Sequence, residues 1–333
     1  MQCNGTPFSN ASLAAIINLN NLYIPFGSFA TATNIICVMV VLSTKQMREK
    51  YGAFGVLSFG YMLNALGLVL LGTVRTQLIY DNSFVSMSTF ACFGRPWPYF
   101  FIVGGQLPAF VLVVMAGERV IAVFKPLIYR TYVIPRTRVI ANNICIVLSI
   151  LSLLIGIVFS YLNREVCTSP ACYTINSTDR LYGTFNYILI VALPFVALLL
   201  NITAYIGAKR LNVSTNMERE LKKVLVSLVL AALAVVLSAV PNVILWGQGI
   251  FWTIPSFSGY LYIGFCCNSA VDLFAFFFMK EDFRNRLLSL ISYGYLNRYF
   301  KVLVVAEKEP RQNMVQNTSV KPPARLSTVG ELR

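Results

Sequence analysis

Seven long segments that are almost free of charge constrain this chain more than any other feature. A helix that crosses a bilayer needs about 20 consecutive, predominantly apolar residues. Segments of roughly that length lie at 22–43, 52–74, 97–117, 139–161, 184–208, 224–247 and 256–279. The composition agrees, because 57% of the 333 residues are hydrophobic and only 12% are charged, whereas about one-quarter of a soluble domain is charged. The sequence therefore predicts an all-α membrane protein with a seven-transmembrane helix bundle over residues 22–279.

The positions of Lys and Arg predict the orientation of this bundle. With the N-terminus outside, 22 of the 27 Lys and Arg residues fall in the inner loops and the tail, and Arg119 falls at an inner helix end. The four that remain outside are Arg75, Arg95, Arg164 and Arg180. Cytoplasmic loops carry an excess of Lys and Arg, so we expect the N-terminus outside. Topology and attraction to anionic membrane lipid then account for the net charge of +14, and no nucleic acid partner is expected.

The segments that flank the bundle carry their own signals. Three Asn-x-Ser/Thr tripeptides fall on the predicted outer side, which supports the orientation and predicts glycosylation at Asn4, Asn10 and Asn176. The first two lie in residues 1–21, which we expect to be an extracellular N-terminus. Residues 280–296 alternate apolar and basic faces, as in a short amphipathic helix on the membrane surface. Residues 297–333 are polar and basic, which predicts a disordered cytoplasmic tail.

Four cysteines lie on the predicted outer side, where disulfides persist: Cys3, Cys92, Cys167 and Cys172. Four cysteines allow three pairings, and the sequence does not choose among them. A bond from Cys92 to Cys167 or Cys172 is favoured, because it would clamp the second outer loop over the bundle. A local bond between Cys167 and Cys172 remains the alternative.

An acid and a base stand side by side where the third apolar segment ends. Ionisable groups near the hydrocarbon core are costly, so Glu118 and Arg119 each need a partner or a water-filled face. Adjacent residues do not stack on a helix surface. We expect Arg119 to hold Glu118 locally in one state and to reach another helix or a protein in a second. The motif therefore predicts a switch, and Pro126 and Tyr129 follow it at a short distance.

These residues resemble the rhodopsin-like family of G-protein-coupled receptors, and the resemblance spans about residues 20–290. In that family an acid, an arginine and usually a tyrosine end the third helix, and an inner loop with proline, leucine and tyrosine follows. Here Glu118, Arg119, Pro126, Leu127 and Tyr129 match, while Val120 replaces the tyrosine. Other family positions match in the first, fifth and sixth helices, at Asn34, Pro194 and Pro241.

The seventh segment is similar to a degraded form of the family's Asn-Ser-x-x-(Asn/Asp)-Pro-x-x-Tyr. This motif begins at Asn268 and contains Asp272, with Leu273 in place of the proline and Phe276 in place of the tyrosine. The second helix has Tyr61 where the family has an aspartate, which puts an allosteric sodium site in doubt. These departures most resemble the divergent chemoreceptor families of nematodes.

The resemblance implies a receptor that activates a heterotrimeric G protein when its sixth helix moves outward. It assigns a G-protein switch to Glu118, Arg119, Pro126 and Tyr129, and a helix switch to Asn34, Pro194, Pro241, Asn268, Asp272 and Phe276. Asp272 is the one ionisable residue deep within an apolar segment, so we expect it to be protonated or hydrogen-bonded to Asn268 or Asn34. The expected location is the plasma membrane, and for a chemoreceptor the sensory cilium.

The predicted ligand is an apolar or weakly polar small molecule. Amine receptors of the family have an aspartate where this chain has Phe101, and light receptors have a lysine where it has Cys266, so neither an amine nor retinal is favoured. Side chains expected to line an outer cavity are Tyr99, Phe100, Phe101, Gln106, Asn186, Asn242, Trp246 and Tyr262. They are mainly aromatic with few hydrogen-bonding groups. A small peptide remains the rival ligand.

Other function classes fit the sequence less well. The chain has no histidine, which removes the commonest general base and metal ligand, and no Gly-rich phosphate loop, so we expect neither an enzyme nor a bound cofactor or metal. A transporter or channel usually places several polar groups at mid-membrane, whereas this chain offers only Asp272. A seven-helix protein without signalling is the third hypothesis, favoured by the missing proline and tyrosine near Asp272 and opposed by Glu118 and Arg119.

Overall fold

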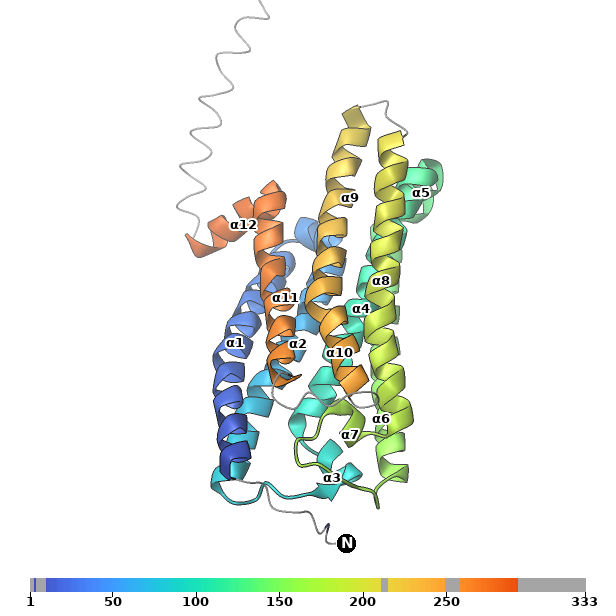
Figure 1. The fold of residues 1–333 in the computed structure, drawn as a ribbon. Coiled ribbons are helices and arrows are strands. Elements are labelled where there is room, and N and C mark those ends of the chain that lie inside the picture. Colours follow the sequence, from blue (N-terminus) through green and yellow to red (C-terminus); the bar gives the residue numbers. More distant parts are fainter. Residues whose placement is uncertain (1–2, 4–9, 211–214, 249–257, 293–333) are drawn as a thin grey trace, which may run out of the picture. The chain divides into compact units, whose positions relative to one another are not determined.

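The computed structural model describes residues 3, 10–210, 215–248 and 258–292 (Figure 1). In this part of the chain, seven helices are long and apolar enough to cross a membrane, and they correspond to the seven predicted segments. The predicted all-α bundle is therefore confirmed at the level of its helices. A two-residue antiparallel pairing of β1 (Met87–Ser88) with β2 (Cys167–Thr168) is the only sheet among the described residues.

The seven spans are built from nine elements. Six spans are single helices: α1 (Asn10–Leu42), α2 (Lys45–Tyr80), α4 (Pro96–Phe124), α6 (Pro135–Leu162), α8 (Arg180–Arg210) and α11 (Ser258–Met279). The sixth span has three parts, which are α9 (Thr215–Ala234), the π-helical η1 (Val235–Ala239) and α10 (Val240–Gln248). Shorter helices lie between or after the spans: α3 (Thr89–Phe93), α5 (Pro126–Tyr132), α7 (Thr174–Ser177) and α12 (Glu281–Ile291).

Most helices extend beyond the apolar segments that predicted them. Helix α1 begins at Asn10, so it takes up much of the segment 1–21 that we expected as an extracellular N-terminus. Helix α2 begins at Lys45 rather than residue 52; Thr44 caps it by accepting a hydrogen bond from the Met47 N–H, and non-helical angles at Tyr51 (φ −122°, ψ 17°) mark a kink. Hydropathy marks only the apolar part of a helix, whereas backbone hydrogen bonding continues into the polar flanks.

Glycine lets α2 and α4 approach closely. A β-carbon at Gly60 would lie 2.6 Å from the ring of Pro108, and one at Gly104 would lie 2.8 Å from the Cα atom of Asn64. Helix association in a bilayer relies on such close packing, because lipid offers apolar contacts as good as those of a neighbouring helix. These contacts place the middle of α4 against α2. On its other sides α4 packs against α8 and α6, while α1 packs against α2 and α11.

The sixth span changes its helix type next to Pro241. Proline has no N–H to donate to the carbonyl four residues earlier, which belongs to Leu237. The chain forms the π-helical segment η1 at this place, where the Val240 N–H reaches back five residues to the Val235 carbonyl. Gly264 of α11 leaves room opposite, since a β-carbon there would lie 3.1 Å from the Leu237 oxygen. Pro194, by contrast, lies within α8 without ending it.

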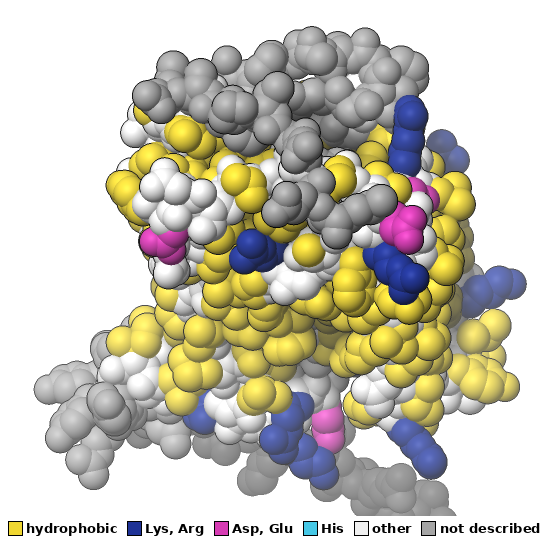
Figure 2. Space-filling model, turned by 90° about the horizontal axis from the view of Figure 1, so that it is seen from below, with side chains coloured by type: hydrophobic (Ala, Val, Ile, Leu, Met, Phe, Trp, Pro, Cys, Tyr) yellow, Lys and Arg dark blue, Asp and Glu magenta, His cyan; other side chains and the backbone are white. Residues whose placement is uncertain are grey.

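Two disulfides define one end of the bundle, which we call the disulfide end. Cys92 bonds to Cys172 and Cys3 bonds to Cys167. Of the alternatives left open by the sequence, Cys92–Cys172 is therefore the one present, and the local Cys167–Cys172 bond is not formed. Seen from this end, hydrophobic side chains make up much of the described surface (Figure 2). Since Cys92 precedes α4 and Arg119 lies near the last turn of α4, we call the opposite end the arginine end.

All of helix α12 except its first residue, Glu281, lies in a second compact unit that begins at Asp282. The helix begins one residue after the predicted start, at Glu281, and Phe283 and Leu287 on one of its faces are buried. Residues 293–296 of the predicted amphipathic helix, and the predicted tail at 297–333, lie outside the described residues.

Candidate functional site

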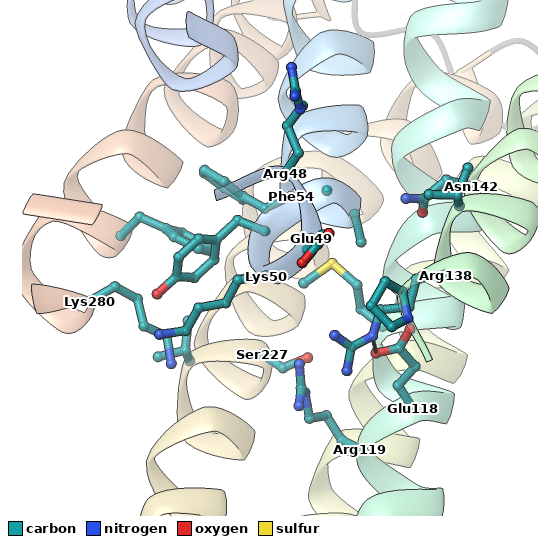
Figure 3. A pocket seen from close by; sticks show the side chains of 18 of the residues that line it. Arg48, Glu49, Lys50, Phe54, Glu118, Arg119, Arg138, Asn142, Ser227 and Lys280 are labelled. Atoms are coloured by element: carbon teal, nitrogen blue, oxygen red, sulfur yellow. Dashed lines mark ion pairs between the residues drawn. The ribbon is translucent and has the colours of Figure 1, made fainter. Parts of the chain in front are cut away.

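A cavity of about 490 Å³ opens at the arginine end of the bundle (Figure 3). Its walls come from α2, α4, α5, α6, α9 and α11. Six of the described lining side chains are basic, and two are acidic, Glu49 and Glu118. The basic ones are Lys45, Arg48, Lys50, Arg119, Arg138 and Lys280. Clefts lined by charges of one sign attract partners of the opposite sign, so the cavity favours an acidic occupant.

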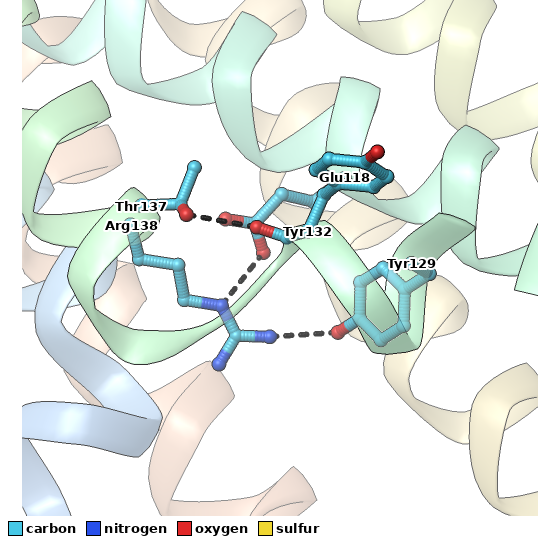
Figure 4. A network of polar contacts seen from close by, with 5 residues as sticks. All are labelled: Glu118, Tyr129, Tyr132, Thr137 and Arg138. Carbon is cyan, nitrogen blue, oxygen red and sulfur yellow. Dashed lines mark hydrogen bonds and ion pairs between the residues drawn. The ribbon is translucent and has the colours of Figure 1, made fainter. Parts of the chain in front are cut away.

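Glu118 is held by a residue that the sequence did not single out. Its Oε2 atom lies 3.3 Å from Nε of Arg138 on α6 (Figure 4). The same guanidinium donates a 2.7 Å hydrogen bond to the Tyr129 hydroxyl on α5. The turn between these helices is closed by the Thr137 hydroxyl, which donates to the Tyr132 carbonyl. Arg138 therefore joins α4, α5 and α6 at the rim of the cavity.

Arg119 does not hold Glu118 in this structure, although that contact was expected in one of its two states. Neighbouring residues on a helix point in different directions, and here Glu118 faces α6 while Arg119 extends into the cavity, as does Ser227 of α9 (Figure 3). The buried Nε of Arg119 has no hydrogen-bond partner among the described residues. In this motif, the Glu118 carboxylate is therefore paired with Arg138, while Nε of Arg119 has no hydrogen-bond partner among the described residues.

Of the other residues assigned to switches, Tyr129 and Phe276 line this cavity. Phe276 forms part of the wall, with its ring stacked on Phe54 at 3.4 Å between centroids and edge-on to Tyr51 at 6.0 Å. Pro126 is not among the described lining residues. It occupies the first position of α5, where a proline needs no hydrogen bond, and thereby starts the turn that carries Tyr129.

Asp272 lies in a buried polar cluster between α1, α2 and α11. Asn34 is the centre of its hydrogen bonds, donating to the Ser269 hydroxyl at 2.6 Å and to the Ser269 carbonyl at 3.1 Å. Asp272 was expected to be protonated or hydrogen-bonded to Asn268 or Asn34, and of these alternatives the hydrogen bond is not formed. Four buried oxygens of the cluster have no partner among the described residues, on Asn34, Ser58, Asn268 and Asp272. The local geometry explains this, because Asn34 meets α11 one turn before Asp272.

A second cavity lies toward the disulfide end and is small, about 30 Å³. Four of the side chains predicted for a ligand pocket line it, namely Phe101, Asn186, Asn242 and Tyr262. Gln106 is buried next to it and donates a 2.7 Å hydrogen bond to Asn186. Three further predicted members, Tyr99, Phe100 and Trp246, do not line it. Trp246 lies on α10, and Tyr99 packs edge-on against Phe93 with centroids 4.8 Å apart.

Arg75 lies near this region, and no sequence motif singles it out. The sequence places it only among four outer basic residues, yet its side chain is 2% exposed. Its guanidinium carbon lies 4.8 Å from the ring centre of Tyr173 and 5.7 Å from that of Trp97. The available signal was its position directly after the apolar segment 52–74, but nothing in the sequence marks it as buried.

Of the predicted glycosylation sites, Asn176 is partly exposed on α7, Asn10 is the first residue of α1, and Asn4 lies outside the described residues. Within the described ranges, no group of three or more His, Cys, Asp or Glu side chains is placed to hold a metal ion. No protein-family model matches the chain, and no curated protein is significantly similar to it.

Proposed function

We propose that this chain is a chemosensory receptor of the plasma membrane that activates a heterotrimeric G protein at its arginine end. The observation that carries the proposal is the basic cavity of about 490 Å³ into which Arg119 extends. A cavity of this size accommodates the end of a helix or a short peptide segment. Six basic side chains against two acidic ones favour a segment that brings acidic groups or a C-terminal carboxylate.

The contacts around Glu118 support a resting state. Arg138 contacts both Glu118 and Tyr129, so α4, α5 and α6 are held to one another at the rim of the cavity. The opposite wall is α9, which leads into the π-helical segment at Pro241. Outward movement of α9 about that segment would widen the cavity and expose more of Arg119 to a partner. A ligand drives such a movement only by binding one state better than the other.

The test does not need a known ligand. The full chain is expressed in cells with a panel of Gα subtypes, and nucleotide exchange is measured without agonist. Glu118→Gln removes one charge of a largely buried ion pair, so we expect it to release the rim by about 1 kcal/mol, which is roughly a fivefold rise in basal exchange. Arg119→Ala should lower exchange by on the order of tenfold, because it removes a charged donor from the partner's site.

The matched control is Glu165→Gln, the same substitution at an exposed carboxylate of the disulfide end, which should leave basal exchange unchanged. Surface delivery of every variant is measured in parallel with an N-terminal tag. If wild type, Glu118→Gln and Arg119→Ala give equal exchange with every Gα subtype while reaching the surface, the chain does not signal in this way. The seven-helix protein without signalling would then be the better description.

A further inference from the structure

Arg75 is buried without any group that neutralises its charge. Its side chain is 2% exposed, and neither Nε nor Nη2 has a hydrogen-bond partner among the described residues. Arginine keeps its proton in proteins, so it cannot escape burial by becoming neutral. Charged groups that are fully buried are ordinarily paired with an opposite charge. The missing partner of Arg75 is therefore a feature that needs a cause.

No carboxylate among the described residues forms an ion pair with Arg75. On the side of the bundle where Arg75 lies, the acidic residues are Asp81 and Glu165, which are exposed, and Asp179, which accepts a hydrogen bond from the Leu181 N–H. Of the stretches outside the described residues, 1–2, 4–9, 211–214 and 249–257 contain no Asp or Glu in their sequence. Among the described residues, then, no carboxylate neutralises Arg75, which leaves its charge open to an anion from outside the chain.

The surroundings hold the guanidinium in place without satisfying it. Tyr173 and Trp97 contact it through their rings, and such cation–π contacts offset only part of the cost of burial. The Trp97 ring is fixed, because its indole donates a 2.9 Å hydrogen bond to the Cys172 carbonyl and Cys172 is bonded to Cys92. This side of the site is thus pre-organised, which lowers the cost of binding.

The two unpartnered donors form a fork. Nε–H and Nη2–H lie on the same edge of the planar guanidinium, and this edge matches the two oxygens of a carboxylate. Aromatic side chains continue from here toward the small cavity. The ring of Tyr173 stacks on that of Tyr262 at 5.7 Å, and Tyr262 lies 6.0 Å from Phe101. An acidic group at Arg75 would therefore be followed by an apolar surface.

We propose that Arg75 binds the carboxylate of an acidic ligand whose apolar part lies against Tyr262 and Phe101. This rests on the proposed receptor function and gives its ligand a chemical class, a small organic acid with a hydrophobic body. Neither donor reaches solvent in this structure, so the acid enters by displacing a neighbouring ring. Tyr173 is partly exposed and lies on a loop, which makes it the contact that yields.

The experiment compares acids with their own primary amides on the purified full chain in lipid nanodiscs. The probes are octanoate, decanoate, phenylacetate and indole-3-acetate, each against the amide of the same skeleton, at constant ionic strength. Thermal unfolding is followed against ligand concentration. A ligand that binds the folded state raises Tm with its concentration. We expect at least one acid to bind wild type on the order of tenfold more tightly than its amide.

Two arginine variants identify the site. Arg75→Met keeps the apolar stem and removes the uncompensated charge, so it should unfold at the same or a higher Tm without ligand and lose the difference between acid and amide. Arg164→Met is the matched control. Arg164 also lies 4.8 Å from a tyrosine ring centre, but it is exposed and donates to the Tyr161 hydroxyl. This variant should respond to acids as wild type does.

Three results would overturn the proposal. One is that no acid in the panel stabilises wild type more than its amide. Another is an acid that stabilises wild type and Arg75→Met equally, which would place its binding elsewhere. The third is a lower Tm of unliganded Arg75→Met, which would mark Arg75 as a structural cation. Because the readout involves no G protein, acid binding without nucleotide exchange would contradict the proposed function and leave the acid site standing.

Discussion

At the scale of single residues, Arg75 and Asp272 are two ionisable side chains with opposite means of tolerating burial. Asp272 is 1% exposed and Arg75 is 2% exposed, and each has buried polar atoms without a partner among the described residues. A carboxylic acid can bind a proton and become neutral, whereas a guanidinium stays charged. Asp272 can therefore remain unpaired in the bundle by binding a proton, whereas Arg75 keeps its charge there.

Phe276 carries a prediction at this scale. Replacing Phe276 with alanine would remove the stacked contact with Phe54 and the edge contact with Tyr51. The resulting void costs about 2 kcal/mol or more of unfolding free energy, since lost packing rather than lost hydrophobic transfer dominates in a bilayer. Thermal unfolding in nanodiscs measures it. Phe274→Ala, on the same helix but 44% exposed, should have little effect; equal losses for both variants would contradict the stacking role.

The sequence could identify charged residues at the arginine end but not their partners. The Glu118–Arg119 motif was readable because it interrupts an apolar run. Its engagement with Arg138 depends on how α4 crosses α6, and no local pattern encodes that crossing. The same holds for Arg75, whose burial follows from a loop that a disulfide draws over it.

At the scale of the elements, the sixth span combines a proline, a π-helical segment and a facing glycine. Pro241 leaves the Leu237 carbonyl without its usual donor, η1 redistributes the local hydrogen bonds, and Gly264 leaves space beside that carbonyl. Segments of π-helix inside longer helices frequently occur at functional sites. The sequence assigned Pro241 to a helix switch, but the π-helical segment beside it could be recognised only from the structure.

Replacing Pro241 with alanine should straighten this span. The restored N–H lets Leu237 regain an α-helical bond, so α9 should change its position relative to α11 at the arginine end. Spin labels at two exposed positions, Leu225 and Phe278, report this as a shifted distance distribution in electron–electron resonance. An unchanged distribution would contradict the role of Pro241 as the source of the π-helical segment.

The close approach of α2 and α4 carries a second prediction. Gly104→Ala would place a β-carbon 2.8 Å from the Cα atom of Asn64, so the helices must separate, at a cost of about 2 kcal/mol. Gly117→Ala lies on the same helix with no atom within 4 Å of the new β-carbon, and should be neutral or slightly stabilising. Thermal unfolding compares the two. Equal stability of both variants would show that the contact yields without cost.

At the scale of the whole molecule, the number and order of the spans were predictable, because hydropathy reports the bilayer directly. The lengths of the helices were not, as α2 illustrates by starting at Lys45. Four of the side chains predicted for a ligand pocket, Phe101, Asn186, Asn242 and Tyr262, line the small cavity near the disulfide end. Tyr99 packs against Phe93 instead, because the sequence does not give the rotation of α4 about its axis.

Glycosylation tests the predicted orientation. With the N-terminus outside, Asn4, Asn10 and Asn176 enter the lumen of the secretory pathway, so removal of N-glycans should speed migration of the wild-type chain on a gel. The triple Asn→Gln variant at these positions should lose that response. Asn212 and Asn317 have the same tripeptide signal but fall on the predicted inner side, and their Asn→Gln variants should keep it. A glycan found on Asn317 would contradict the predicted orientation, because it would place that segment on the outer side.

The two disulfides have a consequence for how the chain is made. In the predicted orientation, Cys3 and Cys92 reach the oxidising compartment first, and 75 further residues must be synthesised before Cys167 follows. At about 5–20 residues per second this is a delay of roughly 4–15 s. The first pair that the nascent chain can form, Cys3 with Cys92, is thus absent from the final protein. A Cys3–Cys92 bond formed at that stage would have to be reopened before Cys3 can bond to Cys167 and Cys92 to Cys172.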